Sequence, residues 1–265
     1  MPHRLIQRGV LGALLFILGT SVALAERCST PLDWPVTFHR SKWAEIEEFK
    51  PKVKNPDMSF NYQGIKETGI GKINLDYFAV RMNKGDLTTA TVLADLRANL
   101  NEIVFSGVNL GIYPASPKER KRWNSSTPLG TIMIFDLARI KSVTLERGAV
   151  ILSCLSEEDF IFSTIQLHLL PIGTHPVSGH RAFGVFQDSE ETITIYVKAV
   201  DRVVRGYFAF GNFGGLTPNS LEVFRENVIF AGGEKVWKNL QNNLVKRYAK
   251  YNAKKLSPIA RRVNY

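Results

Sequence analysis

The stretch 181–198, RAFGVFQDSEETITIYVK, contains two β-strand patterns on either side of a polar turn. Its second part alternates strictly. Positions 193, 195 and 197 hold Ile, Ile and Val, whereas positions 192, 194, 196 and 198 hold Thr, Thr, Tyr and Lys. A period of two places alternate side chains on opposite faces of a strand. The pattern therefore predicts the strands Arg181–Phe186 and Thr192–Lys198, joined by a turn at Asp188-Ser189.

The same type of pattern continues toward the N-terminus. Short separators with turn residues, such as Arg147-Gly148 and Glu157-Glu158-Asp159, divide this region into further strand candidates. The candidates are Thr131–Phe135, Ser142–Glu146, Ala149–Cys154 and Phe160–Leu169. Strands in such close succession are typical of an antiparallel meander, which we expect here.

Helical patterns flank the strand series. Residues 92–103 repeat apolar side chains every three or four positions, after a first strand candidate at Ile73–Val80. Pro114–Pro128 is polar and strongly charged and is expected to be a surface loop. From about Glu234, a final helix carries an apolar and aromatic stripe made of Trp237, Leu240, Leu244, Tyr248 and Tyr251. This order predicts an α+β fold with an antiparallel sheet packed on a long C-terminal helix.

One segment resembles a known group of families. Residues 173–184, GTHPVSGHRAFG, resemble a Gly-His-Pro-x-x-Gly-x-x-x-Phe stretch of uncharacterised START-like bacterial families, with Thr174 inserted between the Gly and the His. Leu244–Tyr248 is similar to their closing helix, and the resemblance covers about residues 150–255. It implies the helix-grip architecture, in which a curved antiparallel sheet wraps the last helix, but no particular activity. Taken alone, Pro176 and Gly179 are expected to form a turn between two strands.

The N-terminus has the pattern of a cleavable signal peptide. Arg4 and Arg8 precede the uncharged apolar run Val10–Ala25, which ends in Ala23-Leu24-Ala25, so we expect cleavage before Glu26. The run is too short for a membrane-spanning helix. The protein is therefore predicted to be exported, to the periplasm or the medium. The expected organisation is a signal peptide (1–25), an irregular segment (26–70) with a short helix at Ser41–Phe49 capped by Ser41, an α+β START-like domain (71–255) and a basic tail (256–265).

Two cysteines remain after cleavage, Cys28 and Cys154. An oxidising compartment allows them to form a disulfide, which would fasten the mature N-terminus to the middle of the chain. The alternative is two free thiols, with Cys154 buried in an apolar strand. The sequence contains no Cys-x-x-Cys and no His-x-x-x-His, so we expect no metal site and no cofactor.

Positive charge is concentrated near the C-terminus. The formal net charge is +10, and residues 235–265 contain Lys or Arg at nine positions and no acid. Lys246, Arg247 and Lys250 lie mostly off the apolar stripe of the last helix, where they could contact an anionic membrane surface. The alternative is a solvated helix face. Nucleic acid is the weaker partner because the protein is expected outside the cytoplasm.

Catalytic candidates are few. His175 and His180 with Asp201 could supply a general base and its orienting acid in an exported hydrolase, with Ser163, Ser178 or Thr164 as nucleophile. No Gly-x-Ser-x-Gly or Ser-x-x-Lys motif accompanies them. We therefore interpret the two histidines as structural, and the hydrolase as the second hypothesis.

A binding protein is the first hypothesis. Helix-grip folds tend to enclose an apolar cavity between the sheet and the last helix, which suits a lipid or another hydrophobic molecule. The candidate lining residues are Phe160, Phe162, Phe183, Tyr196, Trp237 and Leu240. Each of them could equally be a packed core residue. The sequence thus favours non-catalytic binding of a hydrophobic or membrane-derived small molecule, and a secreted effector or toxin module is the third hypothesis.

Overall fold

The computed structural model describes residues 27–33, 37–106, 111–140, 143–168, 174–204 and 218–265. The expected signal peptide lies outside these residues. The strands are β1 (Phe60–Tyr62), β2 (Gly69–Asn83), β3 (Gly111–Pro114), β4 (Ile132–Ile140), β5 (Val143–Leu155), β6 (Asp159–Leu167), β7 (Val177–Gln187), β8 (Thr192–Val204), β9 (Lys254–Lys255) and β10 (Ile259–Val263). The helices are η1 (Arg40–Trp43), α1 (Ala44–Glu47), α2 (Thr89–Ala98), α3 (Leu100–Phe105), α4 (Pro117–Trp123), α5 (Pro218–Arg247) and η2 (Ala249–Tyr251).

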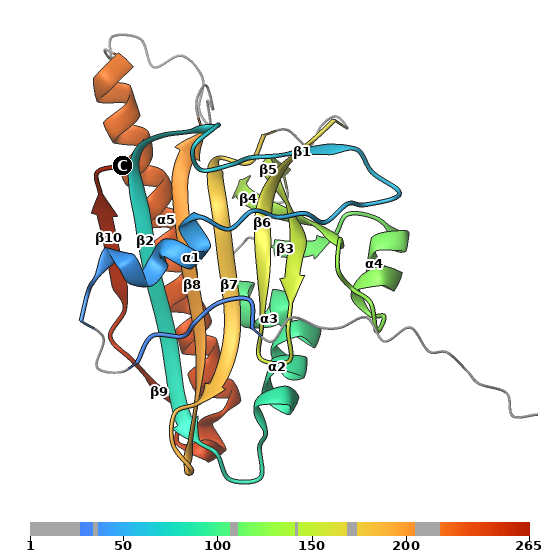
Figure 1. Cartoon of the computed structure of the whole chain (residues 1–265), viewed down its shortest axis with the longest axis vertical. Helices are drawn as coiled ribbons and strands as arrows, with labels where there is room; N and C mark the ends of the chain where they lie inside the picture. Colours follow the sequence, from blue (N-terminus) through green and yellow to red (C-terminus); the bar gives the residue numbers. More distant parts are fainter. Residues whose placement is uncertain (1–26, 34–36, 107–110, 141–142, 169–173, 205–217) are drawn as a thin grey trace, which may run out of the picture.

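The strands form one antiparallel sheet in the order β10-β2-β8-β7-β6-β5-β4-β3. The consecutive strands β3 to β8 are neighbours, which confirms the predicted meander, while β2 crosses over to pair with β8. Figure 1 shows α5 running along one face of this sheet. The predicted α+β fold, an antiparallel sheet packed on a long C-terminal helix, is confirmed.

The face of the sheet toward α5, here called the inner face, carries the largest apolar core. The predicted stripe points into it: Trp237, Leu240 and Leu244 of α5 are buried, as is Tyr248 just after the helix. Tyr251, the last predicted member, lies in η2 and is only partly buried. The helices α2 and α3 close the same core with their apolar positions. Thr88 begins α2 by accepting a hydrogen bond from the Thr91 backbone N–H, in a reciprocal cap. The 3.6-residue periodicity thus identified the buried sides of both helical regions.

The opposite, outer face of the sheet is also covered. A segment called here the strap (residues 27–33 and 37–50) lies across it, and its Trp43 and Ile46 are fully buried against β2 and β8. On β8, the alternation predicted from sequence is present. However, Tyr196 and Lys198 on the outer side are as buried as the apolar residues on the inner side. The strap therefore turns a polar-looking strand face into a second core.

Two segments that we expected to be irregular have regular structure. The Pro114–Pro128 region contains α4, which begins with Pro117 after the cap Ser116, whose hydroxyl accepts from the Glu119 N–H. The segment 26–70 contains η1, α1 and β1, and β1 pairs with β6. Ser41 is not a cap, because η1 already begins at Arg40 and has no side-chain cap.

Three predicted boundaries are wrong. The two predicted strands Ser142–Glu146 and Ala149–Cys154 correspond to the single strand β5, which begins at Val143, because Gly148 continues it opposite Phe135 and makes no turn. Gly179 also lies inside a strand, where a Cβ would stand 2.1 Å from the carbonyl oxygen of Val200, so glycine is needed for close strand approach and not for a turn. The last helix begins at Pro218, well before Glu234.

Residues 256–265 do not form a free tail. Ile259–Val263 is β10, which pairs with Ile73–Tyr77 of β2 and forms one edge of the sheet. The chain folds back after α5, and the side chain of Gln241 donates hydrogen bonds to the carbonyls of Ala79 and Leu256 at this junction. Among the helices of the described residues, none is long and apolar enough to cross a membrane.

Candidate functional site

A cluster of charged side chains lies inside the grip, on the inner face. Ala199 of β8 pairs with Asp76 on one side and with Arg181 on the other. Because the side chain of Ala199 is small, the side chains of Asp76 and Arg181 can meet across it. Arg181 donates from Nη1 and Nη2 to the two carboxylate oxygens of Asp76, at 2.8 and 3.0 Å. Its Nη2 also donates to Asp201 at 2.7 Å, and Asn74 donates to Asp76 at 3.1 Å. We call these four residues the inner charge cluster.

The helix α5 covers the inner charge cluster with an aromatic ring. The guanidinium carbon of Arg181 lies 4.1 Å from the ring centre of Trp237, a cation–π contact. The cluster is nevertheless not fully sealed, since the side chains of Arg181 and Asp201 keep 14% and 8% of their surface exposed. Burial raises the pKa of Asp201 to about 7; Asp76 adds to this, while Arg181 opposes it. A carboxyl group of this kind can accept or donate a hydrogen bond near neutral pH.

His175 lies near this cluster and is buried. The side-chain amide of Gln63 holds its backbone in place, donating to the His175 carbonyl and accepting from its N–H. Its Nδ1 lies 3.0 Å from the carbonyl oxygen of Val177. Burial lowers the pKa of His175 to about 4, so the ring is neutral at pH 7. In the described structure Asp201 bonds to Arg181 and not to His175.

His180 belongs to the outer face. It pairs with Val200, whereas Asp201 pairs with Gly179, so the side chains of His180 and Asp201 point to opposite sides of the sheet. The Nδ1 of His180 lies 2.8 Å from the hydroxyl of Ser163, and Phe49 of the strap packs edge-on against its ring. The sheet register thus separates the dyad that the hydrolase hypothesis would have used.

The aromatic lining candidates are divided between the two faces. Phe160, Phe162 and Phe183 belong with Trp237 and Leu240 to the inner core. Phe160 and Phe183 stack at 5.2 Å between ring centres, and Phe183 contacts Trp237 at 5.9 Å. These rings fill the space beside the inner charge cluster. Tyr196, in contrast, lies on the outer face, stacked on Tyr77, and cannot share a site with the others.

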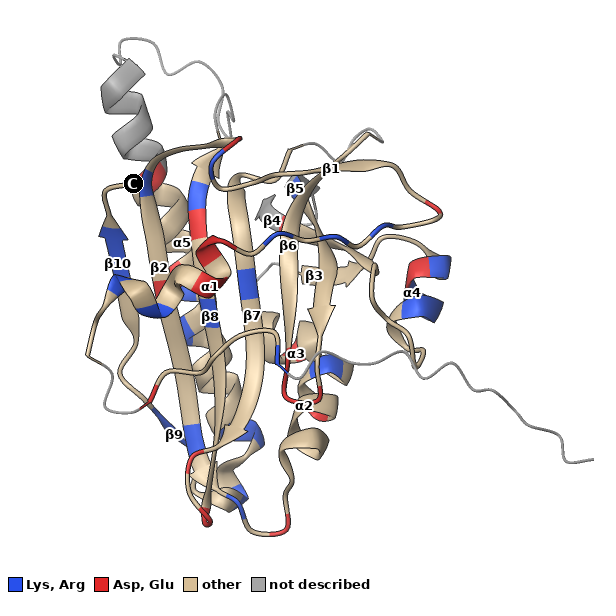
Figure 2. Cartoon of the chain, in the orientation of Figure 1, with Lys and Arg blue, Asp and Glu red and all other residues tan. Residues whose placement is uncertain are grey.

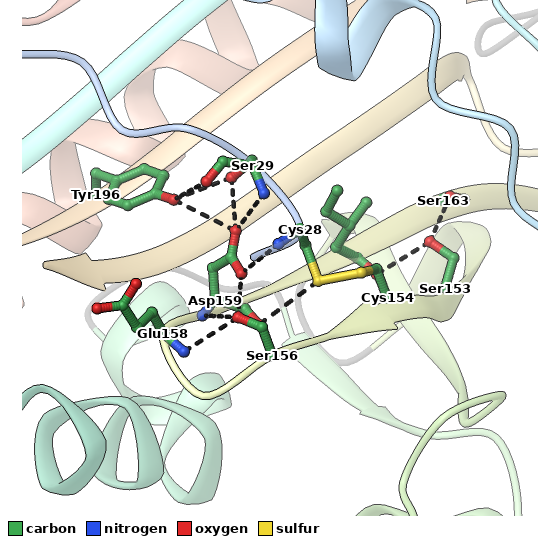
Figure 3. The surroundings of a disulfide bond; sticks show 10 residues. Cys28, Ser29, Ser153, Cys154, Ser156, Glu158, Asp159, Ser163 and Tyr196 are labelled. Carbon is green, nitrogen blue, oxygen red and sulfur yellow. Dashed lines mark hydrogen bonds between the residues drawn. A yellow bond between two sulfur atoms is a disulfide. The ribbon is translucent and has the colours of Figure 1, made fainter. Parts of the chain in front are cut away.

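The outer face has its own buried carboxylate, Asp159, which is fully sealed (Figure 3). It accepts hydrogen bonds from the backbone N–H groups of Cys28 and Ser29, at 2.8 and 2.6 Å. The hydroxyls of Ser29 and Ser156 donate to it as well. The predicted Cys28–Cys154 disulfide is present beside it. Asp159 and the disulfide together fix the start of the strap.

The expected anionic-surface contacts are only partly available. Arg247 is paired with Asp95 and lies 3.6 Å from Glu102, so it fastens α5 to α2 and α3 and is not free for a membrane. Lys246 and Lys250 are exposed. β9 and β10, which pair with β2 at the edge of the sheet, carry further exposed cations (Figure 2). We call this surface the basic edge: Lys246, Lys250, Lys254, Lys255, Arg261 and Arg262.

Three residues of the candidate site were missed by sequence reasoning. Asn74 and Asp76 are polar residues within the otherwise apolar strand 73–80, and that interruption was the available signal. Trp123 stacks on Phe162, but it had been assigned to a loop. In the described part of the chain, no group of three or more His, Cys, Asp or Glu side chains is arranged to hold a metal ion.

No protein-family model and no curated protein sequence matches the chain. Solved structures with a similar fold include the ZhuI aromatase/cyclase of Streptomyces sp. R1128 (12% identity, TM-score 0.40), aligned over 67% of this chain and 98% of that one. A second is a START superfamily protein of Mycobacterium smegmatis, with 10% identity and a TM-score of 0.35 over 68% of this chain and 99% of that one. A third is norcoclaurine synthase of Thalictrum flavum, with 13% identity and a TM-score of 0.35 over 71% of this chain and 96% of that one. Likenesses this distant concern the fold alone, and the proposals below rest on this chain's own side chains.

Proposed function

We propose that this protein binds a small, largely apolar molecule between the sheet and α5, and that the inner charge cluster holds a polar end of that molecule. The observation that carries the proposal is the cluster itself. Buried ion pairs are often no more stable than apolar side chains of the same volume, so their presence in an apolar core calls for another role. Phe183 and Trp237 place an apolar surface directly beside the charges. Apolar walls with a few converging polar groups are typical of small-molecule sites.

The proposed role is binding without catalysis. His180 lies on the outer face of the sheet, and the Nδ1 of His175 lies 3.0 Å from the carbonyl oxygen of Val177. The cluster offers no serine or cysteine among its four members. A site for holding a ligand accounts for Arg181, Asp76 and Asp201 without requiring a nucleophile.

We also propose that the protein is exported, to the periplasm or the medium. The signal-peptide pattern of residues 1–25 supports this. The disulfide between Cys28 and Cys154 supports it independently, because such bonds persist in oxidising compartments. A hydrophobic or membrane-derived molecule is the ligand class that best suits a carrier in that location.

Binding of N-phenyl-1-naphthylamine, an uncharged hydrophobic dye, tests the proposed site. We expect the wild-type protein to bind it with enhanced fluorescence. Trp237→Phe should weaken binding about two- to tenfold, the equivalent of one aromatic contact. Trp43→Phe is the matched control, because Trp43 belongs to the strap and is buried in the outer core. Absence of dye binding, or an equal loss in both variants, would contradict the proposed site.

A second candidate function, docking on an anionic membrane surface, rests on the basic edge. None of its six side chains forms an ion pair with an acidic side chain of the described residues; Lys255 and Arg262 bond instead to the neutral Asn242 and Asn227. Unpaired, exposed cations on one side of a protein attract anionic lipids. Such a surface would bring the protein to the source of a membrane-derived ligand.

Vesicle sedimentation tests this second function. Lys246→Glu with Arg261→Glu should abolish the preference for vesicles containing phosphatidylglycerol over pure phosphatidylcholine, and added salt should have the same effect. The control reverses Arg120 and Lys121, two exposed cations on α4. An equal loss in the control would show that net charge, and not the basic edge, determines binding.

A further inference from the structure

The inner charge cluster contains two carboxylates and one guanidinium. Asp76 takes the end of the Arg181 fork, with one bond to each terminal nitrogen, and Asn74 supports it. This two-bond geometry is the strongest arrangement for an arginine and a carboxylate. The cluster thus has two carboxylates for one cation, and Asp201 shares that cation through a single hydrogen bond from Nη2.

Arg181 is poorly placed to receive an anionic ligand. Both of its terminal nitrogens already donate to carboxylates. One face of its guanidinium is covered by Trp237. An incoming carboxylate or phosphate would meet the negative charges of Asp76 and Asp201 within the same buried space.

Asp201 is well placed to receive a hydrogen-bond donor. Arg181 is its hydrogen-bond donor among the described side chains, and 8% of the Asp201 side-chain surface stays exposed. Among the described neighbours of the cluster, Asn74 carries no charge and the ring of His175 is neutral at pH 7. A buried carboxylate with unused acceptor capacity is stabilised by a charged donor more than by a neutral one.

We infer that the ligand carries a primary amine or a similar cationic donor at its polar end, and that Asp201 is the residue that receives it. The inference rests on the proposed function and identifies the chemical class of its ligand. The amine would complete two ion pairs in the cluster, Asp76 with Arg181 and Asp201 with the ligand. Its apolar part would lie against Phe183 and Trp237.

The test is displacement of N-phenyl-1-naphthylamine by decylamine, decanol and decanoate, which share one chain and differ in the head group. We expect decylamine to displace the dye at concentrations about 10- to 100-fold lower than decanol, the ratio for a hydrogen bond to a charged group. Decanoate should be the weakest. This ranking is measured on the wild-type protein and does not depend on a variant that folds.

Asp201→Asn should reduce the advantage of decylamine over decanol to about threefold or less, with both competitors measured against the dye on the same variant. Asp95→Asn is the control, because it removes one negative charge at the ion pair with Arg247, outside the grip. A ranking with decanoate first, or an amine advantage that Asp201→Asn leaves unchanged, would overturn the inference while the binding site itself survives. Failure of the wild-type protein to bind the dye would overturn the proposed function and this inference together.

Discussion

The two faces of the sheet each bury an aspartate, and they do so in opposite ways. On the outer face, Asp159 is fully enclosed and accepts two backbone N–H groups and two hydroxyls. On the inner face, Asp201 accepts from Arg181 and keeps part of its surface exposed. Both are buried charges, but only one has its hydrogen-bonding capacity filled. The comparison shows that burial alone does not mark a functional group; the unfilled capacity does.

The segments that cover the two faces differ in how they are attached to the sheet. The strap is fastened by a disulfide, by Asp159 and by Lys198, whose ammonium donates to the carbonyl of Thr30 and pairs with Glu45. These links connect the strap to three different strands. On the inner face, Trp237 covers Arg181 by a single aromatic contact. We therefore regard the outer face as a structural core and propose the inner face as the ligand-binding one.

The largest expected effect is the loss of a buried tryptophan. Trp237→Ala should destabilise the protein by about 3–5 kcal/mol, because it leaves a cavity in the inner core. Trp43→Ala on the outer face should cost a similar amount. Urea unfolding monitored by circular dichroism measures both. If Trp237→Ala left the unfolding midpoint unchanged, α5 would not be part of the core, and the inner face would not be the closed grip described here.

The next effect concerns the fastening of the strap. Cys28→Ser with Cys154→Ser should cost about 2–5 kcal/mol, since the bond closes a long loop whose ends are 126 residues apart in sequence. Binding of the naphthylamine dye by the folded fraction should be unchanged, because the site lies on the other face. Unfolding with and without reductant measures the cost. Complete alkylation of both cysteines in unreduced, unfolded protein would show that the bond does not form.

The pH dependence of stability should distinguish the inner aspartate from the histidines. Asp201 has a folded-state pKa of about 7, above the usual 3.8, so between these values the native state holds a proton that the unfolded state has released. The contribution of this proton to the free energy of unfolding is present at low pH and is lost as the pH rises toward 7. Arg181 and Asp76 are the charged groups that face it. Relative to the wild type, Asp201→Asn should therefore gain stability as the pH rises from about 4 to about 7.

His175 and His180 act in the opposite direction. Burial lowers the pKa of each to about 4 from 6.5, so their contribution is present above about 6.5 and is lost as the pH falls toward 4. Thermal unfolding across this range, for the wild type and Asp201→Asn, separates the two trends. Parallel curves for the two proteins would contradict the raised pKa of Asp201.

The smallest effect is expected on the exposed side of α5. Lys246→Ala should change stability by less than about 0.5 kcal/mol. Arg247→Ala should cost up to about 1 kcal/mol, because it breaks the pair with Asp95 that joins α5 to α2. Thermal unfolding of the two variants compares them. Equal effects would show that the Arg247 pair contributes nothing and that the two residues are equivalent surface charges.

The sequence predicted the fold well because its strand and helix periods are strong. The alternation in residues 192–198 and the stripe from Trp237 to Tyr248 lie where they were expected. The disulfide was also predicted. The errors arose where a local pattern was overruled by tertiary pairing. Gly148 resembled a turn residue but continues a strand, and the basic residues 256–265 resembled a tail but complete the sheet edge.

The candidate site was predicted less well. A period of two identifies two faces but not what covers them, so Tyr196 was placed with the inner aromatics although the strap buries it on the other side. The crossover of β2 was invisible in the sequence, and it is this crossover that brings Asp76 to Arg181 across 105 residues. Asp201 was expected to orient a histidine, but it accepts a hydrogen bond from Arg181.

The unfolding free energies of Asp159→Asn and Asp201→Asn, measured at about pH 8, separate the two aspartates; this pH lies above the pKa of about 7 of Asp201. Asp159→Asn should cost about 2–4 kcal/mol, because an amide cannot accept from every donor that surrounds this carboxylate. Asp201→Asn should cost less than about 1 kcal/mol or stabilise the protein, since it removes a charge that is incompletely paired. Equal losses of the larger size would contradict the distinction between a structural outer aspartate and a ligand-binding inner one.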